Sequence, residues 1–241
     1  MPLDLFALTF DANDPRCLAD FWAEVLGRTE TDDHGDGVAL LPTDDTGFRL
    51  RFVPNRYAKT WVSNRAHFDL TSTSLEDQQA RVERALELGG RHYDVGQLPE
   101  EKHVVLADPE DNEFDVLEPG NKFLEGCGLE GALASDGSQA VGYFWSKALG
   151  WPLVWDQDQE TAIQSPQGGT KITWGGPPVA PKPEKNRLHY DLVPTSGGDL
   201  DTEVARLESL GARRIDIGQG DVDWVVMADP DDNEFCVLPP R

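Results

Sequence analysis

Apolar and polar positions in the first 60 residues follow two different periods. Within Leu3–Phe10 every second residue is apolar on one face, as in a strand with one buried side. From a cap at Asp14 to a stop at Gly27 the apolar residues instead recur at helical spacing. Two short apolar runs follow at Val38–Leu41 and Phe48–Val53 and predict further strands. This part of the chain is therefore predicted to fold as strand, helix and then short strands.

The same order of secondary-structure elements begins again at Asn64, and this second unit occurs twice in the chain. NRAHFDL at 64–70 and ADPEDNEFDVLEP at 107–119 match NRLHYDL at 186–192 and ADPDDNEFCVLPP at 228–240. Between each pair lies an amphipathic helical pattern ending in Leu-Gly. Agreement over a whole supersecondary unit identifies an internal repeat, which fixes the fold more firmly than any local signal.

The first unit also has a second copy. A third pattern begins over 123–133, and its helix end FWSKALG at 144–150 matches FWAEVLG at 21–27. The sequence thus predicts an α+β protein of four βαβββ modules. We expect them to pair as two domains, 1–120 and 125–241. Each domain would be a curved mixed sheet with helices outside and a concave cavity inside, where small molecules bind in many proteins.

Composition restricts the partners. With 44 acidic and 21 basic residues, the formal net charge of −23 repels nucleic acid and anionic membranes. The same charge would attract a cationic ligand, or it serves only to keep the protein soluble. The N-terminus has no basic segment before its short apolar run, and the three cysteines form no CxxC pair. We therefore expect a cytoplasmic protein, a monomer or homodimer, without disulfides.

Three motifs carry a resemblance that covers nearly the whole chain in duplicate. They are the FWxxxLG helix ends, the RxHxD strand openings at 65–69 and 187–191, and the ADPxDNEF turns. With these the chain resembles the vicinal oxygen chelate (VOC) superfamily, the glyoxalase and bleomycin-resistance fold, and in particular a glyoxalase-like branch common as two-domain proteins in actinomycetes. This superfamily includes isomerases, lyases, dioxygenases and drug-binding proteins, so the resemblance implies a fold rather than one activity.

The resemblance also implies metal positions. The ligand at the start of the second module falls on His67 and the last-strand ligand on Asp115, and in the second copy these positions hold His189 and Cys236. The first-module positions fall near residues that cannot coordinate a metal: Ala7, Val53, Leu129 and Gly175. At most two of the usual ligands remain in each cavity, for Zn, Mn, Fe or Ni, or for no metal at all.

The alternation of side chains along a strand adds further residues to the metal-ligand positions of each cavity. Residues two apart share a face, so Asp69 and Glu113 should join His67 and Asp115 in one cavity. The second cavity would contain the four equivalent side chains, namely His189, Asp191, Glu234 and Cys236. The alternative is structural, with each His-Asp pair holding its strand and each Glu accepting backbone N–H bonds. His103, which has no counterpart in the second copy, is expected on the surface or in a loop, which would leave one histidine per cavity.

Two further groups are candidates for ligand contacts. Arg49 and Arg51 share one strand face, which lines the cavity or faces solvent; in the cavity an arginine could stabilise a carbonyl or carboxylate. Trp61 and Trp174 are candidates for stacking on a ligand ring, with core packing as the alternative.

Two functions remain open. The first is a protein that binds a small molecule, cationic or aromatic, with an incomplete metal site. The second is a divalent-metal-dependent lyase, isomerase or related enzyme that acts on a small carbonyl substrate through His67 and Asp115, with His67 or Glu113 as the general base.

Overall fold

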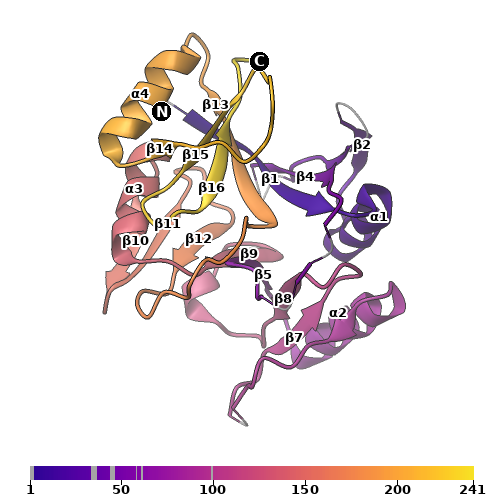
Figure 1. Ribbon diagram of the computed structural model, residues 1–241. Helices are drawn as coiled ribbons and strands as arrows, with labels where there is room; N and C mark the ends of the chain where they lie inside the picture. The colour runs from indigo at the N-terminus through magenta and orange to yellow at the C-terminus, as the bar shows by residue number, and fades with distance from the viewer. Residues whose placement is uncertain (1–2, 34–36, 44–46, 58, 61, 99) are drawn as a thin grey trace.

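The computed structural model describes residues 3–33, 37–43, 47–57, 59–60, 62–98 and 100–241, and it shows four βαβββ modules (Figure 1). The first contains β1 (Leu3–Ala12), α1 (Pro15–Leu26), β2 (Glu30–Asp32), β3 (Val38–Leu40) and β4 (Arg49–Pro54). The second contains β5 (Ala66–Leu70), α2 (Leu75–Glu87), β6 (Arg91–His92), β7 (Val104–Ala107) and β8 (Glu113–Val116). After η1 (Lys122–Leu124) the third contains β9 (Glu130–Ser135), α3 (Gln139–Leu149), β10 (Leu153–Gln157), β11 (Glu160–Gln164) and β12 (Lys171–Trp174). The fourth contains β13 (Leu188–Pro194), α4 (Leu200–Leu210), β14 (Arg213–Arg214), β15 (Val225–Ala228) and β16 (Glu234–Val237).

The pairing of modules differs from the expectation. One eight-stranded sheet has the order β14-β15-β16-β13-β1-β4-β3-β2 and joins the first module to the fourth. The other has the order β10-β11-β12-β9-β5-β8-β7-β6 and joins the second module to the third. We name them the β1/β13 sheet and the β5/β9 sheet after their central antiparallel pairs. The expectation that residues 1–120 and 125–241 would each build a sheet is therefore wrong, because each sheet takes one module from either half.

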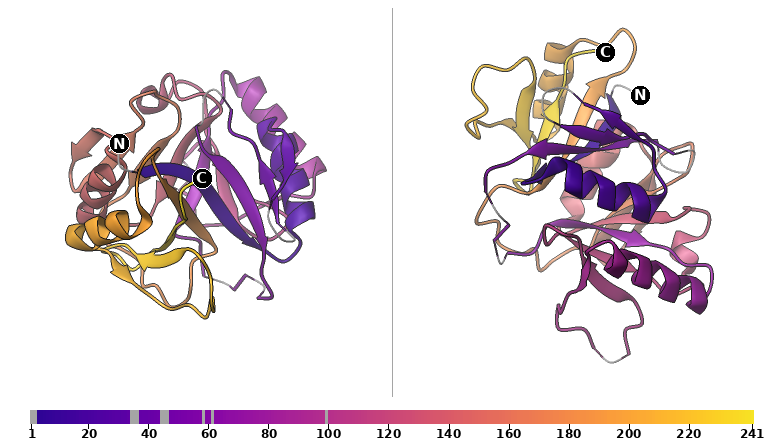
Figure 2. Two further views of the ribbon diagram at one scale, coloured as in Figure 1. Left: turned by 90° about the horizontal axis from the view of Figure 1, so that it is seen from above. Right: turned by 90° about the vertical axis from the view of Figure 1, so that its right-hand side faces the viewer.

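The main hydrophobic core lies between the two sheets. Leu8 and Phe10 of β1 and Phe68 of β5 belong to one buried cluster, although they come from different sheets. In Figure 2 α1 and α2 lie on one side of the molecule and α3 and α4 on the other. Because side chains alternate along a strand, burying this face turns the intervening residues, such as Thr9 and His67, to the outer face of their sheet.

Tryptophan side chains join the modules within each half. The Trp22 ring of α1 lies 5.6 Å from that of Phe68 and 5.1 Å from that of Phe114, and its Nε1–H donates to Asp108 at 3.0 Å. In the other half Trp145 repeats the bond with Asp229 at 3.1 Å. The FWxxxLG helix ends therefore attach each helix to the ADPxDN turn of the following module, and both tryptophans are core residues as expected.

Arginines at the two RxHxD openings connect opposite halves. Arg65 donates from Nη1 to the Asp231 carbonyl at 3.0 Å, in the turn of the fourth module. Arg187 donates from Nη2 to Glu110 at 2.8 Å, in the turn of the second module. A buried bidentate ion pair between Arg28 and Glu130 adds a link between the first and third modules. These reciprocal contacts hold the sheets in one arrangement.

The helix α2 has a cap at each end. The Ser74 hydroxyl accepts from the Asp77 N–H at the start of α2, and Gly89 after that helix has a φ of 101°. β6 is only Arg91–His92, shorter than the strand expected to Val95. No helix in the described part of the chain is long and apolar enough to cross a bilayer.

Candidate functional site

A cluster of acidic and imidazole side chains lies on the outer face of the β5/β9 sheet. His67 and Asp69 are two residues apart on β5, and Asp115 lies opposite Asp69 on the parallel strand β8. The His67 Nε2 is 3.5 Å from an Asp69 oxygen and 3.7 Å from an Asp115 oxygen. One ligand atom from each of the three lies within 4.8 Å of the others. Strand parity thus brings together the residues expected in the first cavity.

Charges within this cluster act on one another. Burial works against the charged imidazole, but the hydrogen bond and charge of Asp69, together with Asp115 and Glu113, outweigh it and raise the pKa of His67. Burial raises the pKa of Asp115 to about 6 against the opposing effect of His67, and Asp69 adds to the rise. In the described part of the chain no lysine or arginine forms an ion pair with Asp69 or Asp115. The two carboxylates therefore have only imidazoles as partners.

One of those imidazoles belongs to His103, a residue that the sequence did not place in this cluster. The His103 Nε2 lies 3.7 Å from the same Asp115 carboxylate that faces His67. His103 lies in the bend just before β7, as a loop residue, but the expectation of one histidine per cavity is wrong. The reason is strand parity: Val105 pairs with Asp115, so the residue two before Val105 shares its face. Extending the strand alternation back from Val105 would have found it.

Glu113 is on the same strand as Asp115 but is already engaged. Its carboxylate accepts from the Lys59 ammonium at 3.0 Å and from the Asn64 N–H at 3.3 Å. Glu234 repeats both bonds in the fourth module, with Lys182 at 2.6 Å and the Asn186 N–H at 3.1 Å. This geometry favours the structural alternative for both glutamates, and Glu113 is poorly placed to be the general base.

The second cluster occupies the equivalent place on the β1/β13 sheet. His189, Asp191 and Cys236 also bring one ligand atom each within 4.8 Å of the others. This cluster is more buried than the His67 cluster, since the Asp191 side chain is 2 % exposed and that of His189 is 11 % exposed. Burial lowers the pKa of His189, and burial together with Asp191 raises the pKa of Cys236 well above that of an ordinary thiol. The thiol is therefore held in its neutral form.

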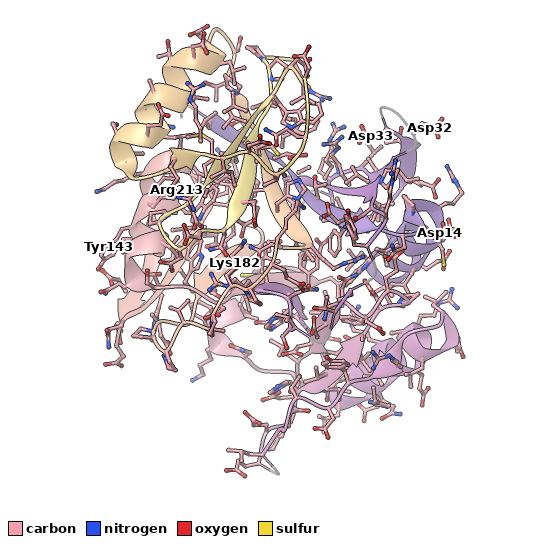
Figure 3. The ribbon with its side chains drawn as sticks, viewed as in Figure 1. Asp14, Asp32, Asp33, Tyr143, Lys182 and Arg213 are labelled. Carbon is pink, nitrogen blue, oxygen red and sulfur yellow. The ribbon has the colours of Figure 1, made fainter. Side chains whose placement is uncertain are left out.

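The Asp191 carboxylate already forms an ion pair with an arginine of the protein. Arg51 of β4 donates from Nη1 to Asp191 and from Nε to Asp33 at 2.5 Å, and the Thr9 hydroxyl donates to Asp191 at 2.7 Å. Figure 3 labels Asp33 next to Asp32, beyond the end of β2. The Arg51 side chain thus lies on the outer face, as one of the two alternatives held. It forms ion pairs with two acids of the protein, however, so its charge is already engaged.

The register shows why the β5/β9 sheet lacks this arrangement. In the β1/β13 sheet His189 pairs with Thr9, and Thr9 with Arg51. In the β5/β9 sheet His67 pairs with Ala134, and Ala134 with Thr173. Alanine and threonine at these two positions cannot neutralise a carboxylate.

Arg49 and Trp174 lie outside both clusters. The Arg49 guanidinium lies over the Phe6 ring at 4.1 Å, and in the other sheet the Lys171 ammonium lies over Phe123 at 4.3 Å. Trp174 is 2 % exposed and belongs to the main core, which is the core-packing alternative expected for it. Trp61 lies outside the described residues.

Comparison with known proteins identifies the modules. The family model of the glyoxalase-like domain matches twice, over residues 7–117 and 132–238. Crystal structures of glyoxalase I from Zea mays superpose with a TM-score of 0.63 at 12 % identity, covering 98 % of this chain and 92 % of that one. A proposed dioxygenase from Bacillus subtilis gives a TM-score of 0.60 at 13 % identity, covering 99 % and 85 %. At such identities the structures show the fold alone. No curated protein matches the sequence significantly.

Proposed function

The chain belongs to the glyoxalase-like domain family, and on that premise we propose that it binds a divalent metal ion at His67, Asp69 and Asp115 and acts there as a lyase or isomerase on a small carbonyl compound. The observation that carries this proposal is the pair of carboxylates on the β5/β9 sheet without a lysine or arginine partner in the described part of the chain. Carboxylates so close together repel one another, and a divalent cation relieves that repulsion.

The donor set fits such an ion. One imidazole and two carboxylates suit Zn, Mn, Fe or Ni, as expected for a site with mixed nitrogen and oxygen ligands. Three protein ligands leave coordination positions for water and substrate, which distinguishes catalytic from structural metal sites. The side chains are also reachable, since those of His67, Asp69 and Asp115 are 34 %, 20 % and 14 % exposed.

When bound, a divalent ion would polarise a substrate carbonyl. The protein would supply the proton transfer. His103 shares the Asp115 carboxylate without being one of the three clustered ligands, so its imidazole is placed to accept or donate a proton beside the substrate. We assign His103 this role in place of Glu113, which Lys59 and Asn64 hold.

Metal titration of chelator-treated protein tests the proposal. Calorimetry with Zn²⁺, Mn²⁺ and Ni²⁺ should give one site per chain in the wild type. His67→Ala should weaken it at least roughly 10-fold to 100-fold, the loss typical even of an outer partner. His189→Ala, the matched change in the other sheet, should leave the affinity unchanged. Absence of binding to the wild type, or loss of binding in His189→Ala alone, would overturn the assignment.

A second candidate is a metal-independent binding protein for an aromatic or cationic compound. One observation favours it: a cleft of about 830 Å³ beside the β1/β13 sheet includes Tyr57, which is 79 % exposed and offers an aromatic ring for stacking. Titrating the metal-free protein with aromatic cations while following tryptophan fluorescence distinguishes the two functions. Tight binding that persists in His67→Ala would favour this candidate.

A further inference from the structure

The two connectors that precede the repeated strands β5 and β13 line one cleft. Lys59, residues 62–65 and residues 180–187, together with Asp136, enclose about 590 Å³, within the usual range for small-molecule sites. The connectors touch directly, because the Thr60 hydroxyl donates to Glu184 at 2.6 Å. Lys182, on the second connector, is labelled near the centre of Figure 3, between the two sheets. The cleft adjoins the one beside the β1/β13 sheet, with which it shares Lys59, Glu184, Lys185 and Arg187, and its lining includes none of the His67 cluster.

This cleft concentrates positive charge in an acidic protein. Five basic side chains line it against two acidic ones, Asp136 and Glu184, although acids outnumber bases by about two to one in the whole chain. The basic residues are Lys59, Arg65, Lys182, Lys185 and Arg187. Lys59, Lys182, Lys185 and Arg187 already form ion pairs with Glu113, Glu234, Asp11 and Glu110. Their attraction for an anionic ligand therefore comes from the N–H donors that these pairs leave unused.

The lysines are held in place from behind. Lys59 and Lys182 donate to Glu113 and Glu234, the first residues of the two equivalent strands β8 and β16. Lys185 donates to Asp11 at 2.6 Å. Each ammonium group has three donors, and these bonds use only part of that capacity. The cleft is therefore preorganised, with lysine side chains already fixed by carboxylates at its wall.

Two unsatisfied donors lie in the same wall. The Nε atoms of Arg65 and Arg187 are buried and have no hydrogen-bond partner among the described residues. Arg187 as a whole is 8 % exposed, so bulk water does not serve it. Both orphaned groups are donors, which a ligand carrying acceptor oxygens would satisfy after a small shift of the side chains.

Four of the seven uncharged lining residues are apolar. Val62 comes from the first connector, and Ala180, Pro181 and Pro183 come from the second; the other three, Ser63, Asn64 and Asn186, are polar. A free inorganic anion would leave this surface without contacts. A ligand with both an anionic group and a hydrocarbon body would match the two kinds of lining at once.

We propose that the cleft that Lys59 and residues 62–65 form with residues 180–187 binds an organic carboxylate with an apolar body. Its carboxylate lies against the lysines and arginines, and its hydrocarbon part lies against the proline and valine side chains. The site joins the two halves of the chain, because each half contributes one connector. It is independent of the metal site proposed at His67.

A fluorescent fatty acid, 11-(dansylamino)undecanoic acid, tests the proposal on the full chain, with its methyl ester as a neutral comparison. We expect enhanced dansyl fluorescence with saturable binding of the acid and at least ten-fold weaker binding of the ester. The double variant Lys182→Gln, Lys185→Gln should bind the acid at least ten-fold more weakly. Lys147→Gln on α3 makes the same kind of charge change elsewhere and should bind as the wild type does.

A second variant guards against misfolding of the lysine variants. Ala180→Trp adds bulk in the cleft without changing charge, while the backbone bonds of Ala180 to Asp136 and Arg65 can remain. It should also lose acid binding, and a urea midpoint near that of the wild type verifies its fold. His67→Ala should bind the acid normally, which separates this result from the metal proposal. Equal binding of acid and ester, or wild-type affinity in Ala180→Trp, would overturn the proposed site.

Discussion

The outer faces of the two sheets began as equivalent positions and now differ in charge. On the β1/β13 sheet Arg51 and Thr9 occupy the carboxylate of Asp191, so that acid is neutralised within the protein. On the β5/β9 sheet the equivalent positions are Thr173 and Ala134, and the acids beside His67 have no such partner. Substitutions at two neighbouring strand positions thus separate a closed ion pair from an open cluster suited to a metal.

The difference shows that residue identity at ligand positions is not enough to define a site. Both clusters bring a histidine and an acid together with a third donor, and the donors are equally close. What distinguishes them is whether another cation of the protein already satisfies the acid. An arginine in the sheet performs part of the electrostatic role that a bound ion would otherwise have.

The largest expected effect is the loss of folding stability when Arg51 is removed. Arg51→Ala removes the guanidinium that pairs with the buried Asp191 carboxylate, and breaking a buried pair from one side costs about 3–5 kcal/mol. Urea unfolding should show a loss of stability of this order. Thr173→Ala at the equivalent position should change the midpoint little. Added Zn²⁺ should restore part of the stability of Arg51→Ala through His189, Asp191 and Cys236, and a stable variant indifferent to zinc would contradict the comparison.

Introducing an arginine at the equivalent position of the β5/β9 sheet should weaken metal binding at the His67 cluster. Thr173→Arg places a guanidinium where Arg51 lies in the other sheet, so it should neutralise Asp69 and compete with a metal ion. We expect metal affinity to fall roughly 10-fold to 100-fold, as an added charge a few ångströms from a partly buried ion would produce. Thr173→Gln has similar length without the charge and should retain affinity. Calorimetric titration measures both, and equal affinities would show that charge is not what separates the sheets.

The smallest effect concerns a feature that the two halves share. Asp108→Asn and Asp229→Asn each present an amide to donors, including the Nε1–H of Trp22 or Trp145. Each should cost roughly 1–2 kcal/mol, in the range for buried donors left unsatisfied. The two costs should be alike because the two turns have the same bonds, and urea unfolding of both variants compares them. A large difference would indicate that the halves have diverged here too.

The same aspartates predict a pH dependence. Burial raises the pKa of Asp108 and of Asp229 to about 6, above the usual value of 3.8. The folded state therefore binds these protons more tightly than the unfolded state, and their contribution to stability is lost as pH rises from about 4 through 6. The stability deficit of each Asn variant relative to the wild type should be greatest near pH 4 and narrow by pH 7. A deficit that widens over this range would contradict the assigned pKa direction.

Much of the candidate site could be predicted from local pattern. Alternation along β5 and β8 was enough to place His67, Asp69 and Asp115 on one face, because residues two apart in a strand share a side. His103 was missed because it precedes a short strand whose register with β8 the sequence does not state. The neutralising contact of Arg51 with Asp191 was also missed, since the two residues are far apart in sequence and belong to different halves.

The sequence by itself determined the βαβββ modules, their duplication, the helix caps and the faces of individual strands, because periodicity and capping act over a few residues. The tertiary structure decided which modules share a sheet, and with that which side chains lie beside each acid. Pairing of the first module with the fourth depends on strand edges and on contacts such as Arg51 with Asp191, which join residues distant in sequence. Such contacts depend on the whole chain being packed at once, so no single segment encodes them.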